Sequence, residues 1–325
     1  MLAISVSHLS KFYKVHKKEP GLLGSIKSFT ARKYETVKAV DDISFNINEG
    51  ELIGFIGPNG AGKTTTLKCL SGLLYPTNGE ISILNFNPSQ RKNIFLKQIS
   101  LVMGQKNQLW WDLPAIDTLK LNKEIYEVPQ KNYEEIVNEL SNLLEIKDLL
   151  KVPVKRLSLG ERMKCELIAS LIHSPKVLFL DEPTIGLDVI MQKKLREFIK
   201  NYNRNFKATI ILTSHYMSDV KALCKRVIII NFGKIIFDGE LLDLIKKNAP
   251  YKIIKVTFAK RIDPKKIAIL GDIKKYDFPN LVLKVSDKNS NKIAAKIFKD
   301  FQVEDLNIEN PQIEDVIGEI FLGKK

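Results

Sequence analysis

Three short runs along the chain are nearly continuously apolar, and they occupy residues 177–180, 209–212 and 226–230. A further short run at 51–56 predicts a strand before a glycine-rich turn. Runs of this length without alternation are typical of strands covered on both faces, as in a parallel sheet flanked by helices. We therefore predict a doubly wound, mostly parallel α/β core.

Other segments carry different patterns. Residues 4–6 and 44–47 alternate apolar and polar side chains, which predicts half-buried strands of an antiparallel β subdomain. Residues from about 88 to 173 have apolar side chains at three- to four-residue spacing and predict a helical subdomain. Examples of this spacing are Ile136, Leu140, Leu143 and Leu144.

The pattern changes near residue 244. Beyond it, predicted strands at 253–258, 281–285 and 303–308 alternate with predicted helices at 292–298 and 313–321. We expect residues 1–243 to form one domain and residues 244–325 a small α+β accessory domain. The latter is either a regulatory ligand-binding domain or a packing extension, and the lack of a ligand motif favours the extension.

A basic insertion at residues 14–40 interrupts the first domain. It carries four apolar residues at near-helical spacing: Leu22, Leu23, Ile26 and Phe29. Two interpretations stay open here. The segment is either amphipathic and lies on a partner or on lipid headgroups, or it is a solvated insertion with one small apolar contact.

Composition sets broad limits on the 325-residue chain, which is 44% hydrophobic and 27% charged, as in ordinary soluble proteins. Its apolar runs are far shorter than the roughly 20 residues of a membrane-spanning helix. His8, Lys11 and Lys14 interrupt any signal-peptide core. We therefore expect a cytosolic protein.

Cysteines and charge add little to this assignment. The three cysteines, Cys69, Cys165 and Cys224, lack metal-ligand spacing and are interpreted as buried reduced thiols. The net charge of +14 suits nucleic acid or an anionic membrane surface, but most of the excess is Lys spread along the chain. It fits a protein that works beside a membrane.

The first chemical motif follows the run at 51–56. It matches the phosphate-binding pattern GxxxxGK[ST] through Gly57, Pro58, Asn59, Gly60, Ala61, Gly62, Lys63 and Thr64, and continues to Thr65. Its backbone N–H groups and the following helix N-terminus suit a phosphate group. Lys63 would reach the β- and γ-phosphates of ATP, and the Thr64 hydroxyl would bind Mg²⁺.

Two carboxylates end the run at 177–180. Asp181 and Glu182 emerge at the carboxyl edge of the predicted sheet, where ligands of open α/β sheets bind. Asp181 can hold Mg²⁺, and Glu182 can polarise the attacking water. A solvent-exposed acidic pair is the alternative, but the phosphate-binding loop requires such a partner.

The residues around these motifs resemble the ABC ATPase family. The segment 157–161 (LSLGE) resembles the family's signature LSGGQ, and residues 185–188 resemble its D-loop. Further matches are Gln105 to the Q-loop glutamine, His215 to the switch histidine, and Tyr13 to the aromatic residue that stacks on adenine. The chain is thus identified as a member over residues 2 to about 239.

This resemblance implies a mechanism. Two copies would bind two ATP head to tail, with each γ-phosphate contacted by Ser158 and Gly160 of the opposite copy. Asp188 belongs to the same set of nucleotide-site residues, His215 would hold the γ-phosphate, and Gln105 would bridge Mg²⁺ and the partner surface. The chain departs from the family at Leu159 and Glu161, and Leu159 is expected to point away from the phosphate.

The chain resembles more narrowly the ATPase subunits of ABC-2-type exporters, whose membrane permease subunits are separate chains. We therefore expect it to lie on the inner face of the cell membrane through its permease. Trp110 and Trp111 would either dock that partner or fill the helical subdomain. The rival function is a soluble ABC ATPase acting on nucleic acid or ribosomes. A single phosphate-binding loop and the absence of coiled coils or CxxC pairs make this less favoured.

Overall fold

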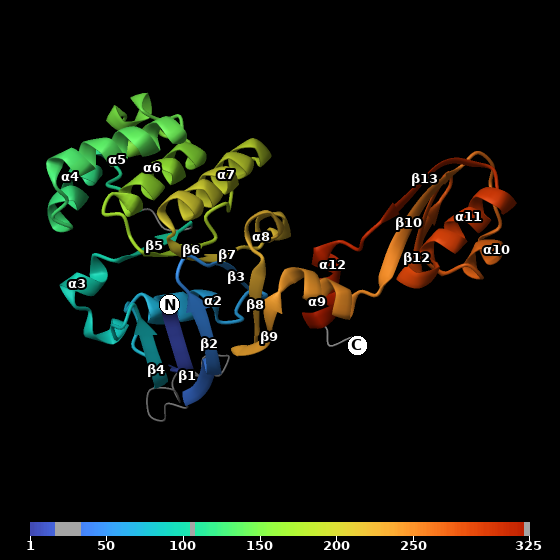
Figure 1. The fold of residues 1–325 in the computed structure, drawn as a ribbon, viewed down its shortest axis with the longest axis horizontal. Coiled ribbons are helices and arrows are strands. Elements are labelled where there is room, and N and C mark those ends of the chain that lie inside the picture. Colours follow the sequence, from blue (N-terminus) through green and yellow to red (C-terminus); the bar gives the residue numbers. More distant parts are fainter. Residues whose placement is uncertain (17–33, 105–107, 322–325) are drawn as a thin grey trace, which may run out of the picture. The chain divides into compact units, whose positions relative to one another are not determined.

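The computed structural model describes residues 1–16, 34–104 and 108–321. The chain divides into two compact units, Met1–Gly239 and Glu240–Lys325 (Figure 1). Each has its own hydrophobic core.

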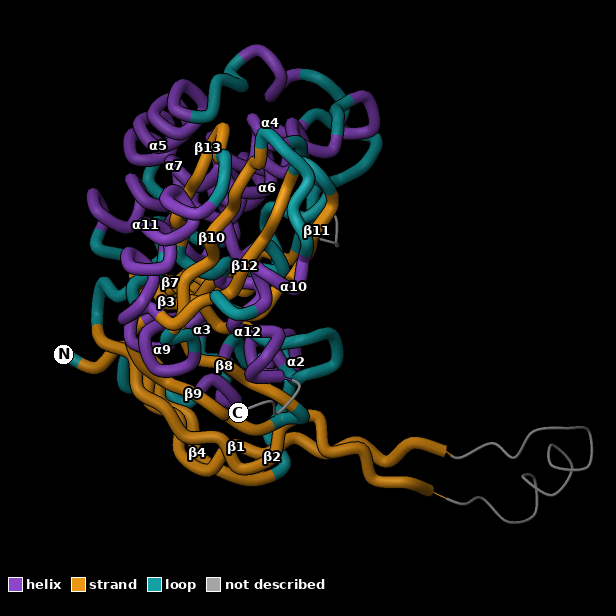
Figure 2. The backbone as a smooth tube through the Cα atoms, turned by 90° about the vertical axis from the view of Figure 1, so that its right-hand side faces the viewer, coloured by secondary structure: helices purple, strands orange, loops and turns teal. Residues whose placement is uncertain are grey.

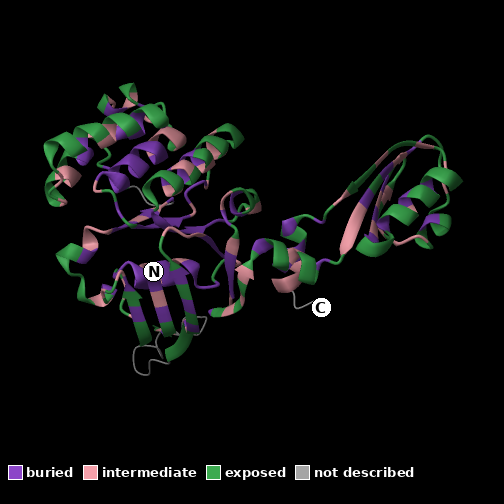
Figure 3. Ribbon diagram, in the orientation of Figure 1, coloured by how far each residue is buried: buried purple, intermediate pink, exposed green. Residues whose placement is uncertain are grey.

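A six-stranded sheet forms the centre of the first unit. Its strands are β3 (Leu52–Ile56), β5 (Ile99–Met103), β6 (Val177–Asp181), β7 (Thr209–Thr213), β8 (Arg226–Asn231) and β9 (Lys234–Glu240). They follow the order β5-β6-β7-β3-β8-β9, and the pairs from β5 to β8 are parallel. Every residue of β6 and β7 is buried (Figure 3). The predicted parallel α/β core is confirmed.

Residues 88–173 are mostly helical as predicted, but strand β5 lies among these helices and was not predicted. It pairs with β6 at the edge of the sheet, where Val102 lies opposite Leu180. The five residues Ile99–Met103 are apolar except for Ser100, and so short an apolar segment fits a buried helix as well as a strand. Pairing with β6 makes this segment a strand, and the local sequence pattern does not encode that pairing.

The α-helices of the first unit flank this sheet. They are α2 (Lys63–Leu70), α3 (Asn93–Leu96), α4 (Ala115–Ile125), α5 (Gln130–Leu143), α6 (Leu159–Leu171), α7 (Val189–Phe206) and α8 (Met217–Leu223). Helices α4, α5 and α6 lie together as the helical subdomain (Figure 1). None of the described helices combines the length and the hydropathy that a bilayer-spanning helix requires.

An antiparallel sheet of β1 (Leu2–His16), β2 (Tyr34–Asn48) and β4 (Asn78–Ile83) completes the first unit, in the order β2-β1-β4. The strands predicted at 4–6 and 44–47 are parts of β1 and β2. These strands run on past β4 as a two-stranded ribbon to the pair His16 and Tyr34 (Figure 2). Both ends of the expected insertion at 14–40 are therefore strand. Leu22, Leu23, Ile26 and Phe29 lie outside the described residues.

The second unit has the order β10 (Tyr251–Phe258), α10 (Pro264–Ala268), β11 (Asp272–Asp277), β12 (Asn280–Ser286), α11 (Ser290–Asp300) and β13 (Val303–Glu309). Its antiparallel sheet runs β11-β12-β10-β13, which is a ferredoxin-like split βαβ arrangement. Helices α9 (Leu241–Asn248) and α12 (Ile313–Phe321) precede and follow this arrangement in the chain and pack against each other. The small α+β appendage is confirmed.

Candidate nucleotide-binding site

The loop between β3 and α2 is tightly packed on one side and open on the other. A Cβ on Gly57 would lie 2.2 Å from the Ile230 carbonyl oxygen, and one on Gly62 would lie 2.4 Å from that of Ala39. A Cβ on Gly60, by contrast, would have no atom within 4 Å. The loop therefore packs its backbone onto β8 and β2 while its tip faces open space, which fits the close approach of a phosphate.

Lys63 lies at the start of α2 with only 5% of its surface exposed. Its ammonium donates to the carbonyl oxygens of Gly57 (2.7 Å) and Pro58 (3.1 Å). Desolvation lowers the pKa of Lys63, while the negative charges of Glu182 and Asp181 act in the opposite direction. These two loop carbonyls hold the cation where phosphate oxygens could replace them as stronger, charged acceptors.

Asp181 connects the loop to the sheet. Its carboxylate accepts hydrogen bonds from Thr64 Oγ1 (2.8 Å) and from Thr213 Oγ1 (2.6 Å). Among the described residues, no group of three or more His, Cys, Asp or Glu side chains could hold a metal ion. Mg²⁺ commonly binds through one or two protein oxygens together with water and substrate phosphates. Thr64 and Asp181 therefore fit this ion.

Glu182 and His215 meet at the carboxyl ends of β6 and β7. Glu182 Oε1 lies 2.6 Å from His215 Nε2. Glu182 adopts a left-handed backbone with φ of 56°, and its N–H bonds to both oxygens of Thr213. This turn directs the carboxylate out of the strand toward the histidine. The two side chains keep 12% and 34% exposure, so water can reach them.

The signature segment forms the start of α6. Ser158 caps this helix in a capping box, since its Oγ accepts from the Glu161 N–H while Glu161 accepts from the Ser158 N–H. The Ser158 N–H and Ser158 Oγ both donate to the Glu161 carboxylate at 2.8 Å, and these two hydrogen bonds lower the pKa of Glu161. A glutamate at 161 therefore stabilises the helix start as a charged residue.

Leu159 and Gly160 pack against the neighbouring D-loop. Leu159 is 39% exposed, and its Cδ2 lies 2.6 Å from where a Cβ on Gly186 would stand. Gly160 faces Met191. Asp188 caps α7 by accepting from the Met191 N–H at 2.9 Å. Ser158, Gly160 and Asp188 thus form a second cluster at the starts of α6 and α7.

Two other predicted site residues, Tyr13 and Gln105, are not among these contacts. Tyr13 lies on β1 opposite Val37 with 36% exposure, and Lys11 Nζ is 5.3 Å from its ring centroid. Gln105 lies outside the described residues. Thr213 was missed by sequence reasoning; its only signal was a hydroxyl at the end of a buried strand, just before Ser214 and His215.

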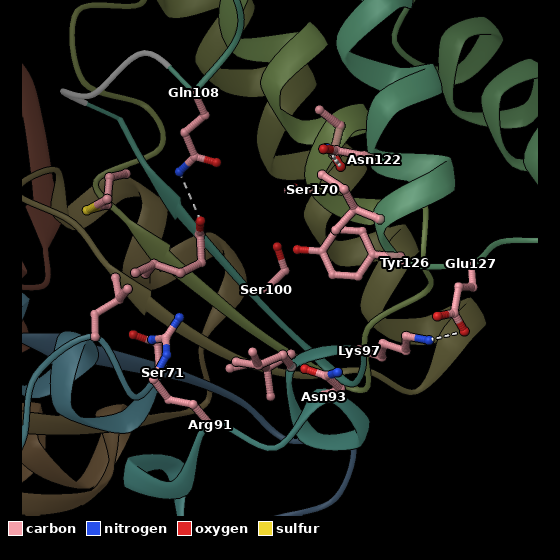
Figure 4. A pocket seen from close by; sticks show the side chains of 17 residues that line it. Ser71, Arg91, Asn93, Lys97, Ser100, Gln108, Asn122, Tyr126, Glu127 and Ser170 are labelled. Carbon is pink, nitrogen blue, oxygen red and sulfur yellow. Dashed lines mark hydrogen bonds and ion pairs between the residues drawn. The ribbon is translucent and has the colours of Figure 1, made fainter.

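A cavity of about 490 Å³ opens between the sheet edge and the helical subdomain (Figure 4). Its polar wall includes Gln108, whose side chain donates to the Leu101 carbonyl at 3.0 Å, and Asn122, which donates to the Ala169 carbonyl. Trp110 and Trp111 follow Gln108 in sequence, and each is 51% exposed. The alternative that they fill the core is therefore wrong.

Comparison with known proteins identifies the two units separately. A family model described as "ABC transporter" matches residues 40–185, and one described as "EvrA-like ABC transporter, C-terminal domain" matches residues 250–309. The ABC transporter ATP-binding protein NatA of Bacillus subtilis (strain 168) is 35% identical over 65% of this chain and 86% of its own. The bacitracin transport ATP-binding protein BcrA of Bacillus licheniformis is 33% identical over 68% and 71%.

Solved structures support the fold. An ATP-binding subunit of an ABC transporter superposes with a TM-score of 0.63 at 24% identity, over 75% of this chain and 92% of that one. The ATP-binding cassette MJ0796, a dimer in a post-hydrolysis state with ADP and Pi, superposes with a TM-score of 0.61 at 21% identity, over 73% and 98%. The relatives are transporter proteins, so the nucleic-acid alternative is not favoured.

Proposed function

The chain belongs to the ATP-binding proteins of ABC transporters, which bind and hydrolyse ATP, and we propose a mechanism for this hydrolysis. Two copies enclose two ATP molecules and drive separate membrane permease subunits. The transporter is an exporter of the ABC-2 type, and the chain is cytoplasmic and bound to the inner face of the membrane through its permease.

The observation that carries this proposal is the contact between Glu182 and His215 at 2.6 Å, beside Lys63, Thr64 and Asp181. Glu182 accepts a proton from the attacking water, and His215 orients that water against the γ-phosphate. Proton acceptor and orienting group lie at the ends of adjacent buried strands. The pair therefore needs little rearrangement for the reaction.

The phosphates are held by the loop at residues 57–64, with Lys63 on the β- and γ-phosphates and Tyr13 stacked on adenine. Thr65 and Gln105 complete the nucleotide contacts. Thr64, Asp181 and Gln105 would hold Mg²⁺, which would supply positive charge to neutralise the β- and γ-phosphates. Each protein group acts by position and charge, as phosphoryl transfer requires.

The second copy supplies the cluster of Ser158, Gly160 and Asp188. Ser158 offers a helix N-terminus, which suits a γ-phosphate, and a hydroxyl that would donate to the phosphate in place of Glu161 Oε2. The surface around it supports contact with another chain, because Val189 and Ile190 are apolar and 77% and 72% exposed. ATP thereby joins two copies, and hydrolysis releases them when the γ-phosphate contacts are lost.

The permease docks beside the cavity of Figure 4, with Trp110 and Trp111 among its contacts. A further structural relative supports separate membrane subunits. It is cbiO1 from Clostridium perfringens, described as part of the ABC transporter complex cbiONQ, with a TM-score of 0.60 at 24% identity. Support for an ABC-2 exporter comes from the similarity to NatA and BcrA.

Glu182→Gln tests the hydrolytic and the dimer proposals together. The variant should hydrolyse ATP at least 100-fold more slowly, because it loses the proton acceptor but keeps the phosphate contacts. With Mg-ATP, light scattering after size exclusion should show a stable species of twice the 37.0 kDa chain mass.

Two further variants serve as controls. Adding Ser158→Ala to Glu182→Gln should weaken the dimer, and Lys63→Ala should abolish ATP-dependent dimerisation. Wild-type turnover by Glu182→Gln would exclude Glu182 as the proton acceptor. A monomer at saturating ATP would exclude the shared nucleotide site.

A further inference from the structure

Asp219 is a fully buried carboxylate that the proposed chemistry does not use. It lies in the first turn of α8, and its residue surface is 0% exposed. Thr184 Oγ1 donates to Asp219 Oδ2 at 2.5 Å, and Ser214 Oγ donates to the same oxygen at 2.8 Å. Arg196 Nη1 donates to the other oxygen at 2.7 Å. A buried charge is tolerated when it is paired and hydrogen-bonded in this way.

The three donors come from three segments that end at the proposed site. Thr184 follows Glu182 by two residues in the loop after β6. Ser214 directly precedes His215 after β7. Arg196 lies on α7, the helix that Asp188 caps, and α7 packs against α8. One carboxylate thus connects the loops of Glu182, His215 and Asp188.

The connection leaves each hydroxyl little freedom. Thr184 and Ser214 are each 1% exposed, so water does not compete for their single protons. Ser214 Oγ also accepts a hydrogen bond from the Tyr216 N–H at 3.0 Å. Ser214 is therefore held from both sides, and its fixed position sets where the backbone of His215 leaves the strand.

We propose that Asp219 is a positioning residue for ATP hydrolysis, which fixes the Glu182–His215 pair and the start of α7 relative to each other. This inference depends on the proposed roles of Glu182 and His215. Asp219 itself does not reach the reacting atoms. Asp219 affects the hydrolysis rate because the 2.6 Å contact between Glu182 and His215 depends on the separation of their two loops. A misplacement of about 1 Å at a reacting group can lower a rate about 100-fold.

The experiment compares purified full-length variants for kcat, KM for ATP and urea midpoint. Asp219→Asn keeps the shape of the side chain but removes its charge. Thr184→Val removes the hydroxyl, whereas Thr184→Ser keeps it. The control is Asp238→Asn, which breaks another carboxylate–guanidinium pair of the same unit, that of Asp238 with Arg226 at 2.7 and 2.9 Å.

We expect Asp219→Asn and Thr184→Val to lower kcat by about 10- to 100-fold while KM changes less than about threefold. Thr184→Ser should retain kcat within about threefold, because it still donates to Asp219. Asp238→Asn should lower the urea midpoint without lowering kcat. Together these results would separate positioning from stability.

Three results would overturn the inference: unchanged kcat in both Asp219→Asn and Thr184→Val, equal kcat losses in Asp219→Asn and Asp238→Asn, or equal losses in Thr184→Val and Thr184→Ser. If Asp219→Asn does not fold, the Thr184 pair decides alone. Glu182→Gln is the reference. Wild-type turnover in that variant would refute the proposed function, whereas an inactive Glu182→Gln with normal Asp219 and Thr184 variants would refute only this inference.

Discussion

Glu166 lies on α6 with only 2% of its surface exposed. Its contacts are weak for a buried carboxylate: the Gln108 N–H donates at 3.4 Å, and Arg162 Nε lies 3.8 Å away. Burial raises the pKa of Glu166 to about 7 from 4.5, and the Gln108 and Arg162 contacts offset this only in part. The folded chain therefore holds this proton more tightly than the unfolded chain does.

Glu166 thus predicts a pH dependence of stability. Between pH 4.5 and about 7 the folded state binds more protons, so the contribution of Glu166 to the free energy of unfolding falls as pH rises. Glu166→Gln should be more stable than wild type at pH 8 by about 2 to 3 kcal/mol, but not at pH 4. Urea unfolding at both pH values measures this. An equal difference at pH 4 and pH 8 would contradict the raised pKa.

At the residue scale, sequence reasoning reached side chains whose chemistry is local to a motif. The glycine-rich turn after one strand defines the positions of Lys63 and Thr64. The end of a buried apolar run defines those of Asp181 and Glu182. Thr213 and Asp219 were missed. Their hydrogen bonds cross between segments about 30 residues apart, and no local pattern shows which buried hydroxyl or carboxylate faces which loop.

Among elements, the contact between the start of α6 and the loop before α7 gives the unusual leucine of the signature segment a packing role. Gly186 has φ of 72°, where side chains are strained, and Leu159 occupies the space beside its Cα. Gly186→Ala should lower the free energy of unfolding by about 1 to 3 kcal/mol, as measured in urea. The loss should be smaller in a Leu159→Ala background, since only the backbone strain then remains.

Gly318→Ala is a suitable control for this prediction. Gly318 lies within α12, and a Cβ there would have no atom within 4 Å. Alanine should therefore be neutral or stabilise by up to about 1 kcal/mol. Additive losses for Gly186→Ala and Leu159→Ala would show that the two residues do not share a steric contact.

The strands that were predicted and those that were missed differ in a physical way. Continuous apolar runs gave β6, β7 and β8, because both faces of these strands are buried. Strand β5 was hidden in a helical region, and β11 carries Lys274 and Lys275 at the edge of its sheet. Strand β11 is paired on one side only and carries lysines, as edge strands often do, so its apolar pattern is weak.

For the whole molecule, the separate cores of Met1–Gly239 and Glu240–Lys325 predict two thermal transitions. A non-hydrolysable ATP analogue binds the first unit and should stabilise it by about 2.7 kcal/mol at 100 times its Kd. Differential scanning calorimetry should show that only one transition moves. Lys63→Ala should remove the shift, and a single transition that moves as a whole would refute independent units.

The register of the central sheet has one more consequence. Met103, Asp181 and Thr213 lie opposite one another on β5, β6 and β7. Side chains alternate between the two faces of a strand. One residue inserted within β6 would therefore place a leucine at the position of Asp181 and move the carboxylate to the opposite face of the sheet, among apolar side chains. Tolerated changes in length between related chains should therefore fall in loops at the opposite, amino-terminal ends of these strands, and the frame of the sheet itself should be invariant.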